Sequence, residues 1–121
     1  MSKYKSKLEA RVAGLLGDNW EYEPPSVPYT IQRNYIPDFK QGDTYIEVKG
    51  YFRSGDAAKY KAIAKQMKED GNMFIMLFQK PFAFVRKGSK TTYAKWCEKN
   101  GIAWESTERA WMYAAEESED E

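Results

Sequence analysis

The chain has 121 residues, of which 42% are hydrophobic and 31% charged, and its 19 basic and 18 acidic residues leave a formal charge of +1. This length is typical of one domain with a core of its own. The absence of histidine excludes Ser-His-Asp and Cys-His catalysis, His-ligated zinc and any nuclease with a histidine base, and a single cysteine, Cys97, excludes an intrachain disulfide and a CxxC site.

The charge is distributed unevenly along the chain. Residues 1–100 hold 18 basic and 11 acidic residues, a charge of +7, whereas residues 101–121 hold one basic and seven acidic residues, a charge of −6. A basic body with an acidic tail is compatible with a polyanionic partner. The N-terminus lacks an apolar signal core and the longest apolar run is too short to span a membrane, so we expect a cytoplasmic protein.

The first half of the chain predicts one helix followed by short strands. Leu8, Val12, Leu15 and Leu16 recur at helical spacing, which predicts a helix over residues 3–16 that ends at Gly17. Strands are predicted over residues 20–23, 29–32, 35–39 and 44–48, with a hairpin connection at 40–43 and a loop at 50–55. Three prolines between residues 24 and 28 require an extended chain there.

The second half predicts two or three helices around a buried strand. Asp56 is predicted to cap a helix over residues 57–69, with an apolar face of Tyr60, Ile63, Ala64 and Met67. We expect a strand buried on both faces at 73–78, a further strand at 81–85, a basic loop at 86–90 and a helix capped by Thr91 or Thr92 that ends at Gly101. Residues 104–115 are ambiguous and allow a last short helix, and 116–121 read as a disordered acidic tail. This order indicates an α/β fold with a mixed sheet.

Large aromatic side chains and the cysteine are expected to pack rather than to bind. Tyr93, Trp96, Trp104 and Trp111 are interpreted as core and edge residues, and Cys97 as a small buried hydrophobe.

Two carboxylates and a lysine fall on the predicted hairpin. Asp38 lies in Pro37-Asp38-Phe39, and Glu47-Val48-Lys49 begins nine residues after Asp38. Because side chains alternate along a strand, Glu47 and Lys49 share a face. Carboxylates beside a fixed cation suit Mg²⁺ and the hydrolysis of a phosphodiester, with the lysine orienting water and stabilising charge. The alternative is a surface hairpin with an ordinary cross-strand Glu–Lys pair.

The register of the hairpin decides whether these groups meet. An even-numbered connection with Phe39 opposite Thr44 sets Asp38 opposite Tyr45 and makes it the diagonal neighbour of Glu47 on the same face. An odd-numbered connection would place the two carboxylates on opposite faces.

These residues resemble the PD-(D/E)XK nuclease superfamily and, more closely, the endonuclease I family of T-seven-type bacteriophages, which are Holliday-junction resolvases. The matching segments are Lys7-Leu8-Glu9, Trp20-Glu21-Tyr22-Glu23, Val27-Pro28-Tyr29, Tyr35-Ile36-Pro37-Asp38-Phe39, Ile46-Glu47-Val48-Lys49-Gly50, Lys87-Gly88-Ser89, Thr92-Tyr93 and the stretch from Trp96 to Ile102. The family's basic C-terminal extension is replaced here by an acidic tail, so no DNA contact is carried over beyond Ile102.

The resemblance implies a restriction-endonuclease-like mixed sheet flanked by helices, in a domain-swapped homodimer. Residues 1–115 would form one nuclease domain, with 24–34 as the strand that bridges two protomers. Glu9 from the first helix of one protomer would join Asp38, Glu47 and Lys49 of the other as the catalytic set. The metal ligands would be Asp38, Glu47, Glu9 and the carbonyl of Val48, holding Mg²⁺ with Mn²⁺ as a substitute. Without the resemblance, Glu9 is better explained as an ordinary solvated helix residue.

Basic residues are predicted to contact DNA phosphates, which provides affinity rather than sequence specificity. The set comprises Lys3, Lys5, Lys7, Arg53, Lys61, Lys65, Arg86, Lys87, Lys90 and Lys95. Solvated surface explains the lysines of the middle helix, which include Lys68, about as well as DNA does. Arg53 follows the strand that carries Lys49 and is therefore expected near the scissile phosphate.

Three functional hypotheses follow. The first is a metal-dependent endodeoxyribonuclease, phage- or prophage-encoded, that resolves four-way junctions and other branched DNA by paired cuts. The second is a nicking or restriction-type nuclease for linear duplex. The third is a junction-binding protein without catalysis.

Overall fold

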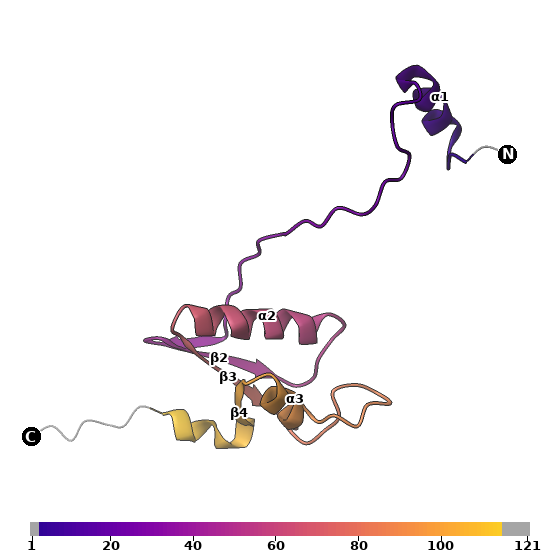
Figure 1. The fold of residues 1–121 in the computed structure, drawn as a ribbon. Coiled ribbons are helices and arrows are strands. Elements are labelled where there is room, and N and C mark those ends of the chain that lie inside the picture. The colour runs from indigo at the N-terminus through magenta and orange to yellow at the C-terminus, as the bar shows by residue number, and fades with distance from the viewer. Residues whose placement is uncertain (1–2, 115–121) are drawn as a thin grey trace, which may run out of the picture. The chain divides into compact units, whose positions relative to one another are not determined.

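The computed structural model describes residues 3–114, and the chain divides into two compact units, residues 1–33 and 34–121 (Figure 1). The first unit contains the helix α1 (Lys7–Leu16), and the Ser6 hydroxyl accepts a hydrogen bond from the Glu9 amide as its N-cap. The helix therefore begins at residue 7, four residues later than the predicted start, because its N-cap is Ser6. Gly17 ends it as predicted, with a φ of 89°.

The strands predicted at 20–23 and 29–32 are wrong for the single chain. Residues 24–34 have no regular structure, and no strand pairs with them among the described residues. Prolines remove backbone donors here, so an extended segment of this kind forms a ladder only where another edge is offered to it. The boundary between the two units falls at the end of this segment.

The second unit is built on a four-stranded mixed sheet in the order β1-β2-β3-β4, which confirms the expected mixed sheet. The strands are β1 (Phe39–Gln41), β2 (Thr44–Lys49), β3 (Met73–Phe78) and β4 (Ala103–Ser106). β1 pairs antiparallel with β2, and β2, β3 and β4 run parallel. The helices are α2 (Asp56–Glu69) and α3 (Tyr93–Lys99), followed by the 3₁₀ helix η1 (Thr107–Tyr113).

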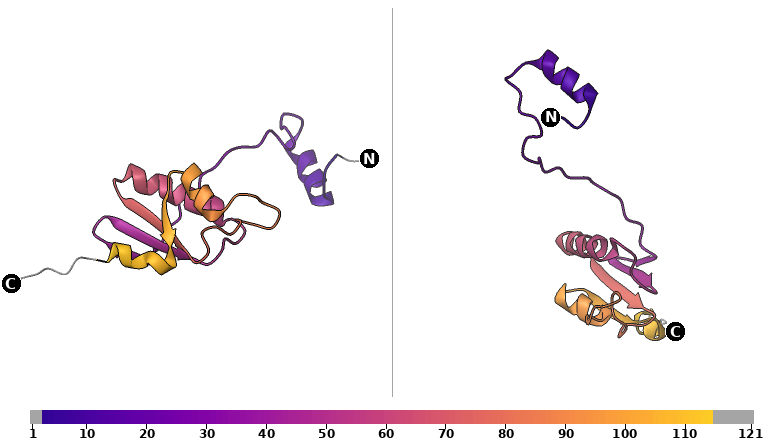
Figure 2. Two further views of the ribbon diagram at one scale, coloured as in Figure 1. Left: turned by 90° about the horizontal axis from the view of Figure 1, so that it is seen from below. Right: turned by 90° about the vertical axis from the view of Figure 1, so that its right-hand side faces the viewer.

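Alternation along the strands separates the two faces of the sheet. Phe74, Met76 and Phe78 of β3 lie on the face covered by α2 and α3, while Ile75 and Leu77 point to the opposite face, where η1 lies (Figure 2). All five are buried, so the prediction of a strand buried on both faces is confirmed. The loop at 50–55 and the end of the middle helix at residue 69 are also as predicted.

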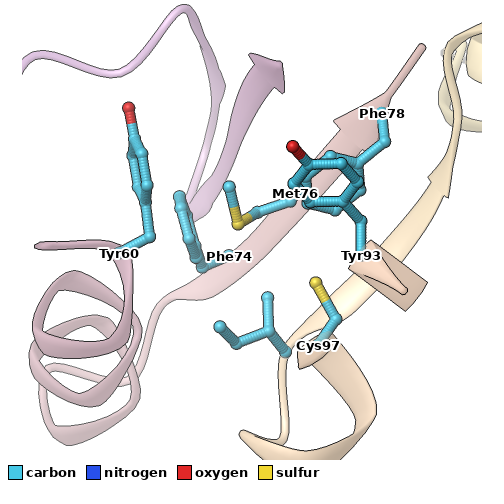
Figure 3. Close-up of a cluster of buried hydrophobic side chains, with 7 residues drawn as sticks. Tyr60, Phe74, Met76, Phe78, Tyr93 and Cys97 are labelled. Carbon is cyan, nitrogen blue, oxygen red and sulfur yellow. The ribbon is translucent and has the colours of Figure 1, made fainter. Parts of the chain in front are cut away.

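Aromatic side chains dominate the core between the sheet and its two helices. Tyr60 of α2 and Tyr93 and Cys97 of α3 pack against the row of β3 side chains that faces these helices, Phe74, Met76 and Phe78 (Figure 3). Cys97 is fully buried, as predicted, and burial raises the pKa of its thiol to about 12. In the close-up the Tyr60 ring stands beside Phe74, and its hydroxyl lies at the end of the ring farther from the middle of the cluster.

Several sequence-based boundaries in this unit are corrected. The segment 81–85 is not a strand: it has only one isolated bridge, Phe84 to Thr92. The ambiguous segment 104–115 begins within β4, whose four residues are too few to show a period, and continues as η1, the short helix that the sequence allowed. Trp111 is 69% exposed and so is not a core residue, whereas Trp96 and Trp104 pack against the core.

Candidate active site

Glu47 is a charged residue in an otherwise apolar core. It lies on the β2 face that packs under α2, level with Met76 of β3, and is 6% exposed. Tyr60 donates its hydroxyl to Oε2 across 3.0 Å, and Tyr35 donates its hydroxyl to Oε1. Burial, together with the hydrogen bond to Glu47, raises the pKa of both tyrosines, so their hydroxyls remain donors at neutral pH. The buried carboxylate is thereby satisfied at both oxygens.

Asp38 lies beside Glu47 across the hairpin. The observed register pairs Phe39 with Ile46, so the residue before the strand falls level with Glu47 rather than diagonal to it. The connection is the two-residue turn Gly42-Asp43, still even-numbered, and the left-handed φ of Gly42 (56°) makes so tight a turn possible. The predicted pairing of Phe39 with Thr44 was therefore wrong. The connection nevertheless has an even number of residues, so Asp38 and Glu47 lie on the same face of the hairpin, as predicted.

A hydrogen bond fixes the Asp38 side chain against β2. Its Oδ2 accepts from the Val48 amide across 2.8 Å, which leaves Oδ1 for a ligand. Asp38 is exposed to solvent, whereas Glu47 is buried. The pair thus offers one carboxylate oriented by the core and one at the surface.

Lys49 lies between two carboxylates at the end of β2. Its Nζ is 3.9 Å from Oε2 of Glu47 and 3.9 Å from Oδ2 of Asp56, and it stands 5.1 Å from the centre of the Tyr60 ring. The lysine side chain is 23% exposed, so its ammonium is held at the boundary between core and solvent.

Three residues of this arrangement were missed as site residues in the sequence. Asp56 was predicted to cap α2, but Gly55 is the cap and the Asp56 carboxylate instead accepts from the Arg53 amide at 2.8 Å and approaches Lys49. Tyr60 was predicted only as part of an apolar face, and Tyr35 only as a strand residue. The one available signal was that Asp56 and Tyr60 are four residues apart on a helix and so share a face.

Glu9 belongs to the other unit. It is exposed on α1, and its Oε1 accepts from the Tyr22 hydroxyl at 3.0 Å. The structure therefore brings Asp38, Glu47 and Lys49 together in the second unit, and Glu9 stands in the first. Within residues 3–114, no group of three or more Asp, Glu, His or Cys side chains gathers in a way that could hold a metal ion.

The basic residues predicted to contact DNA lie on the surface. Exposed positions are occupied by Lys3, Lys5, Lys7, Arg53, Lys61, Lys65, Arg86, Lys87, Lys90 and Lys95. Lys5 differs from the rest because it forms a 2.8 Å ion pair with Glu23, which raises its pKa. The Arg53 guanidinium carbon lies over the Tyr51 ring, 5.9 Å from its centroid, in the loop that follows β2. Their role as DNA contacts stays a prediction.

A mixed sheet that brings Asp38, Glu47 and Lys49 together is the arrangement expected from the resemblance to PD-(D/E)XK nucleases. A family model for phage endonuclease I matches residues 1–117, and the chain belongs to that family. It is 35% identical over 106 residues to "Endodeoxyribonuclease 1" of Enterobacteria phage T3, covering 82% of this chain and 68% of the relative. It is likewise 35% identical over 106 residues to "Endonuclease I" of Escherichia phage T7, covering 82% of this chain and 70% of the relative. No helix within residues 3–114 is long and apolar enough to cross a membrane.

Proposed function

We propose that the protein is a metal-dependent endodeoxyribonuclease that resolves four-way (Holliday) junctions and other branched DNA by paired phosphodiester hydrolysis in the host cytoplasm. The observation that carries this proposal is the convergence of Asp38, Glu47 and Lys49 on one hairpin. Family membership supports it, since the two relatives are named as an endodeoxyribonuclease and an endonuclease.

The donor set suits a hard divalent cation. Asp38, Glu47 and the Val48 carbonyl would hold Mg²⁺, or Mn²⁺ in its place, with Glu9 of the partner subunit as the further carboxylate. Oδ1 of Asp38 is available for this, and Glu47 is held in one orientation by two tyrosine hydroxyls. A bound metal would supply an activated water and stabilise charge on the phosphate.

Lys49 acts directly on the reacting phosphate in this proposal. Its ammonium lies 3.9 Å from the Glu47 carboxylate, at the edge of the core, where it can orient the attacking water and stabilise the charge that develops on the phosphoryl oxygens. Asp56 keeps that ammonium from folding away toward solvent, because it offers a second carboxylate at the same distance. Arg53, on the adjoining loop, would hold the flanking phosphate.

The homodimer with exchanged N-terminal segments is the second part of the proposal. Helix α1 buries none of its residues, and Leu8, Leu15 and Leu16 are 62%, 82% and 50% exposed. An amphipathic helix with an uncovered apolar stripe is suited to packing on another protomer. Residues 24–34 would then form the bridge, and two composite sites in one dimer would cut two strands.

A cleavage assay tests the function against its rivals. A four-way junction and a linear duplex of equal length and base composition are incubated with the protein in Mg²⁺, in Ca²⁺ and in EDTA. We expect paired cuts in the junction with Mg²⁺, binding with poor cleavage in Ca²⁺, and loss of cleavage with retained binding in Glu47→Gln. Preferential cutting of the duplex would favour the nicking or restriction-type nuclease. Junction binding without cleavage in any metal would favour the non-catalytic protein.

A further inference from the structure

The loop between β3 and α3 presents two phenylalanine rings to solvent. Phe82 is 73% exposed and Phe84 is 56% exposed. The loop alternates over this stretch: Phe82, Phe84 and Arg86 face outward, whereas Pro81, Ala83 and Val85 are buried or half-buried. The buried and half-buried residues of the loop already pack against the core. Packing in the core therefore does not explain why two phenylalanine rings point outward from a basic loop.

The loop that carries these rings is anchored by its own backbone. The Val85 amide donates to the Thr91 carbonyl at 2.8 Å, the Tyr93 amide donates to the Ala83 carbonyl at 3.1 Å, and the Ala94 amide donates to the Pro81 carbonyl at 2.9 Å. The Phe82 ring also meets the Trp104 ring edge-on, with centroids 5.7 Å apart. A surface held in this way loses little conformational freedom when a ligand binds to it.

Charge around the rings favours a polyanion. Arg86, Lys87 and Lys90 lie at the exposed tip of the same loop, and the sequence contains no aspartate or glutamate between residues 71 and 97. Trp111, which is exposed to a similar degree, lies instead on η1, whose first turn carries Glu108. Of these two surfaces, only the one formed by Phe82 and Phe84 combines exposed rings with positive charge that no nearby acidic residue of the loop offsets.

The loop also starts beside the candidate active site. Lys49 is the register partner of Phe78, and the Gln79 amide donates to the Lys49 carbonyl at 3.0 Å. The loops after β2 and after β3 therefore leave the same edge of the sheet (Figure 1). DNA whose phosphate lies at Lys49 passes close to the base of this loop.

We propose that Phe82 and Phe84 form a stacking surface for nucleobases exposed at a discontinuity in the DNA duplex, such as a branch point or a frayed arm. This inference rests on the proposed function, in which DNA is the substrate. Arg86, Lys87 and Lys90 hold the adjoining phosphates, while the rings take up unstacked bases. An intact duplex offers no free base face between its ends, so the rings add affinity for branched DNA and little for the interior of a linear duplex.

The test compares ring-deletion variants on two DNAs. Dissociation constants are measured in EDTA for a four-way junction with 2-aminopurine at the branch point and for a linear duplex with the same label inside. The variants are Phe82→Ala/Phe84→Ala, the aromatic replacement Phe84→Trp, and the control Trp111→Ala. We expect the double variant to lose roughly five-fold or more of its junction affinity, with less than about two-fold change on duplex. We also expect it to lose the fluorescence change at the branch, and we expect Phe84→Trp to retain both.

Three outcomes would overturn the inference. An equal loss of affinity for junction and duplex would mean that the rings act only through the stability of the fold or through the phosphate contacts. Thermal unfolding of each variant would distinguish these two causes. Unchanged DNA binding would exclude stacking. A double variant with wild-type DNA affinity but an altered mass by light scattering would assign the rings to contacts between copies of the chain. Wild-type protein that neither binds nor cuts any DNA would instead refute the proposed function itself.

Discussion

The Tyr60 hydroxyl reaches Oε2 of Glu47 across 3.0 Å from a position that is 1% exposed. The tyrosine is the place where the hydrophobic core touches the candidate catalytic carboxylate. Its ring belongs to the aromatic cluster, while its hydroxyl belongs to the site. Packing of α2 on the sheet therefore sets the orientation of Glu47.

Tyr60→Phe separates these two roles, because it keeps the ring and removes the donor. A hydrogen bond to a charged group contributes about 1.5–3 kcal/mol, and we expect the free energy of unfolding to fall by about 2 kcal/mol. Urea denaturation followed by circular dichroism measures it. Tyr113→Phe, on the outer helix η1, is the matched control and should change stability by less than about 0.5 kcal/mol. Equal stability of the two variants would show that the Glu47 hydrogen bond contributes nothing net.

Asp38→Asn tests the charge of Asp38 apart from its structural hydrogen bond. The amide oxygen can still accept from the Val48 amide, so we expect stability within about 0.5 kcal/mol of wild type. Loss of the negative charge removes a cation ligand, and cleavage should fall roughly 100-fold or more. Single-turnover cleavage and denaturation on the same preparation measure both. Asp38→Ala, which loses the acceptor as well, should lower stability too; full activity in Asp38→Asn would remove this residue from the metal set.

Mixed dimers test whether the sites are composite. Glu9→Ala and Lys49→Ala proteins are each expected to be inactive, and refolding them together should give heterodimers with one intact and one doubly damaged site. Such dimers should nick a junction on one strand, not make paired cuts. If each site were built within a single protomer, both sites of the heterodimer would be damaged and no cleavage would return.

Removal of residues 116–121 tests the acidic tail, which lies outside the described residues. This deletion takes away five negative charges per chain. We expect tighter binding to both junction and linear duplex, a steeper fall of affinity with salt, and poorer discrimination between the two DNAs. A titration series at several salt concentrations measures all three, and a truncated protein indistinguishable from wild type would make the tail irrelevant to DNA binding.

The buried cysteine provides a probe of global opening. Because burial raises the pKa of the Cys97 thiol to about 12, the native thiol should resist alkylation at pH 8 and react once urea unfolds the chain. The thiol has a higher pKa in the folded state than in the unfolded state, so the unfolded state loses this proton at a lower pH. The free energy of unfolding therefore falls as the pH rises above about 9. Rapid labelling of native protein at pH 8 would contradict the burial.

Local pattern was sufficient for much of this fold and for the hairpin site. Leu8 to Leu16, Tyr60 to Met67 and the apolar run at 73–78 each carry a clear period or a long apolar stretch, and each forms the element expected. The strands at 20–23 and 29–32 failed because pairing depends on a partner that local sequence does not contain. β4 was missed because it is short, and its stability comes from the neighbouring β3.

In the candidate site, too, the features set by local sequence could be predicted, and those set by contacts between distant segments could not. Glu47 and Lys49 were placed on one face by alternation alone, which needs no tertiary knowledge. Tyr60 and Asp56 escaped notice because their roles depend on α2 lying over β2, a contact between segments distant in the chain. The four-residue connection predicted for the hairpin was too long, since Gly42-Asp43 suffices once the glycine adopts a left-handed conformation.

The place of β2 in the sheet has a kinetic consequence. It is an interior strand, paired with β1 on one side and with β3 along its whole length, whereas residues 24–34 form no ladder in the chain described. In a deuterium-exchange experiment the amides of residues 45–48 should be among the slowest of the chain to exchange. Glu47 and Lys49, which we propose to be catalytic, thus lie on a strand that we expect to open only when the whole unit unfolds. Loss of activity on heating should therefore follow global unfolding of the unit.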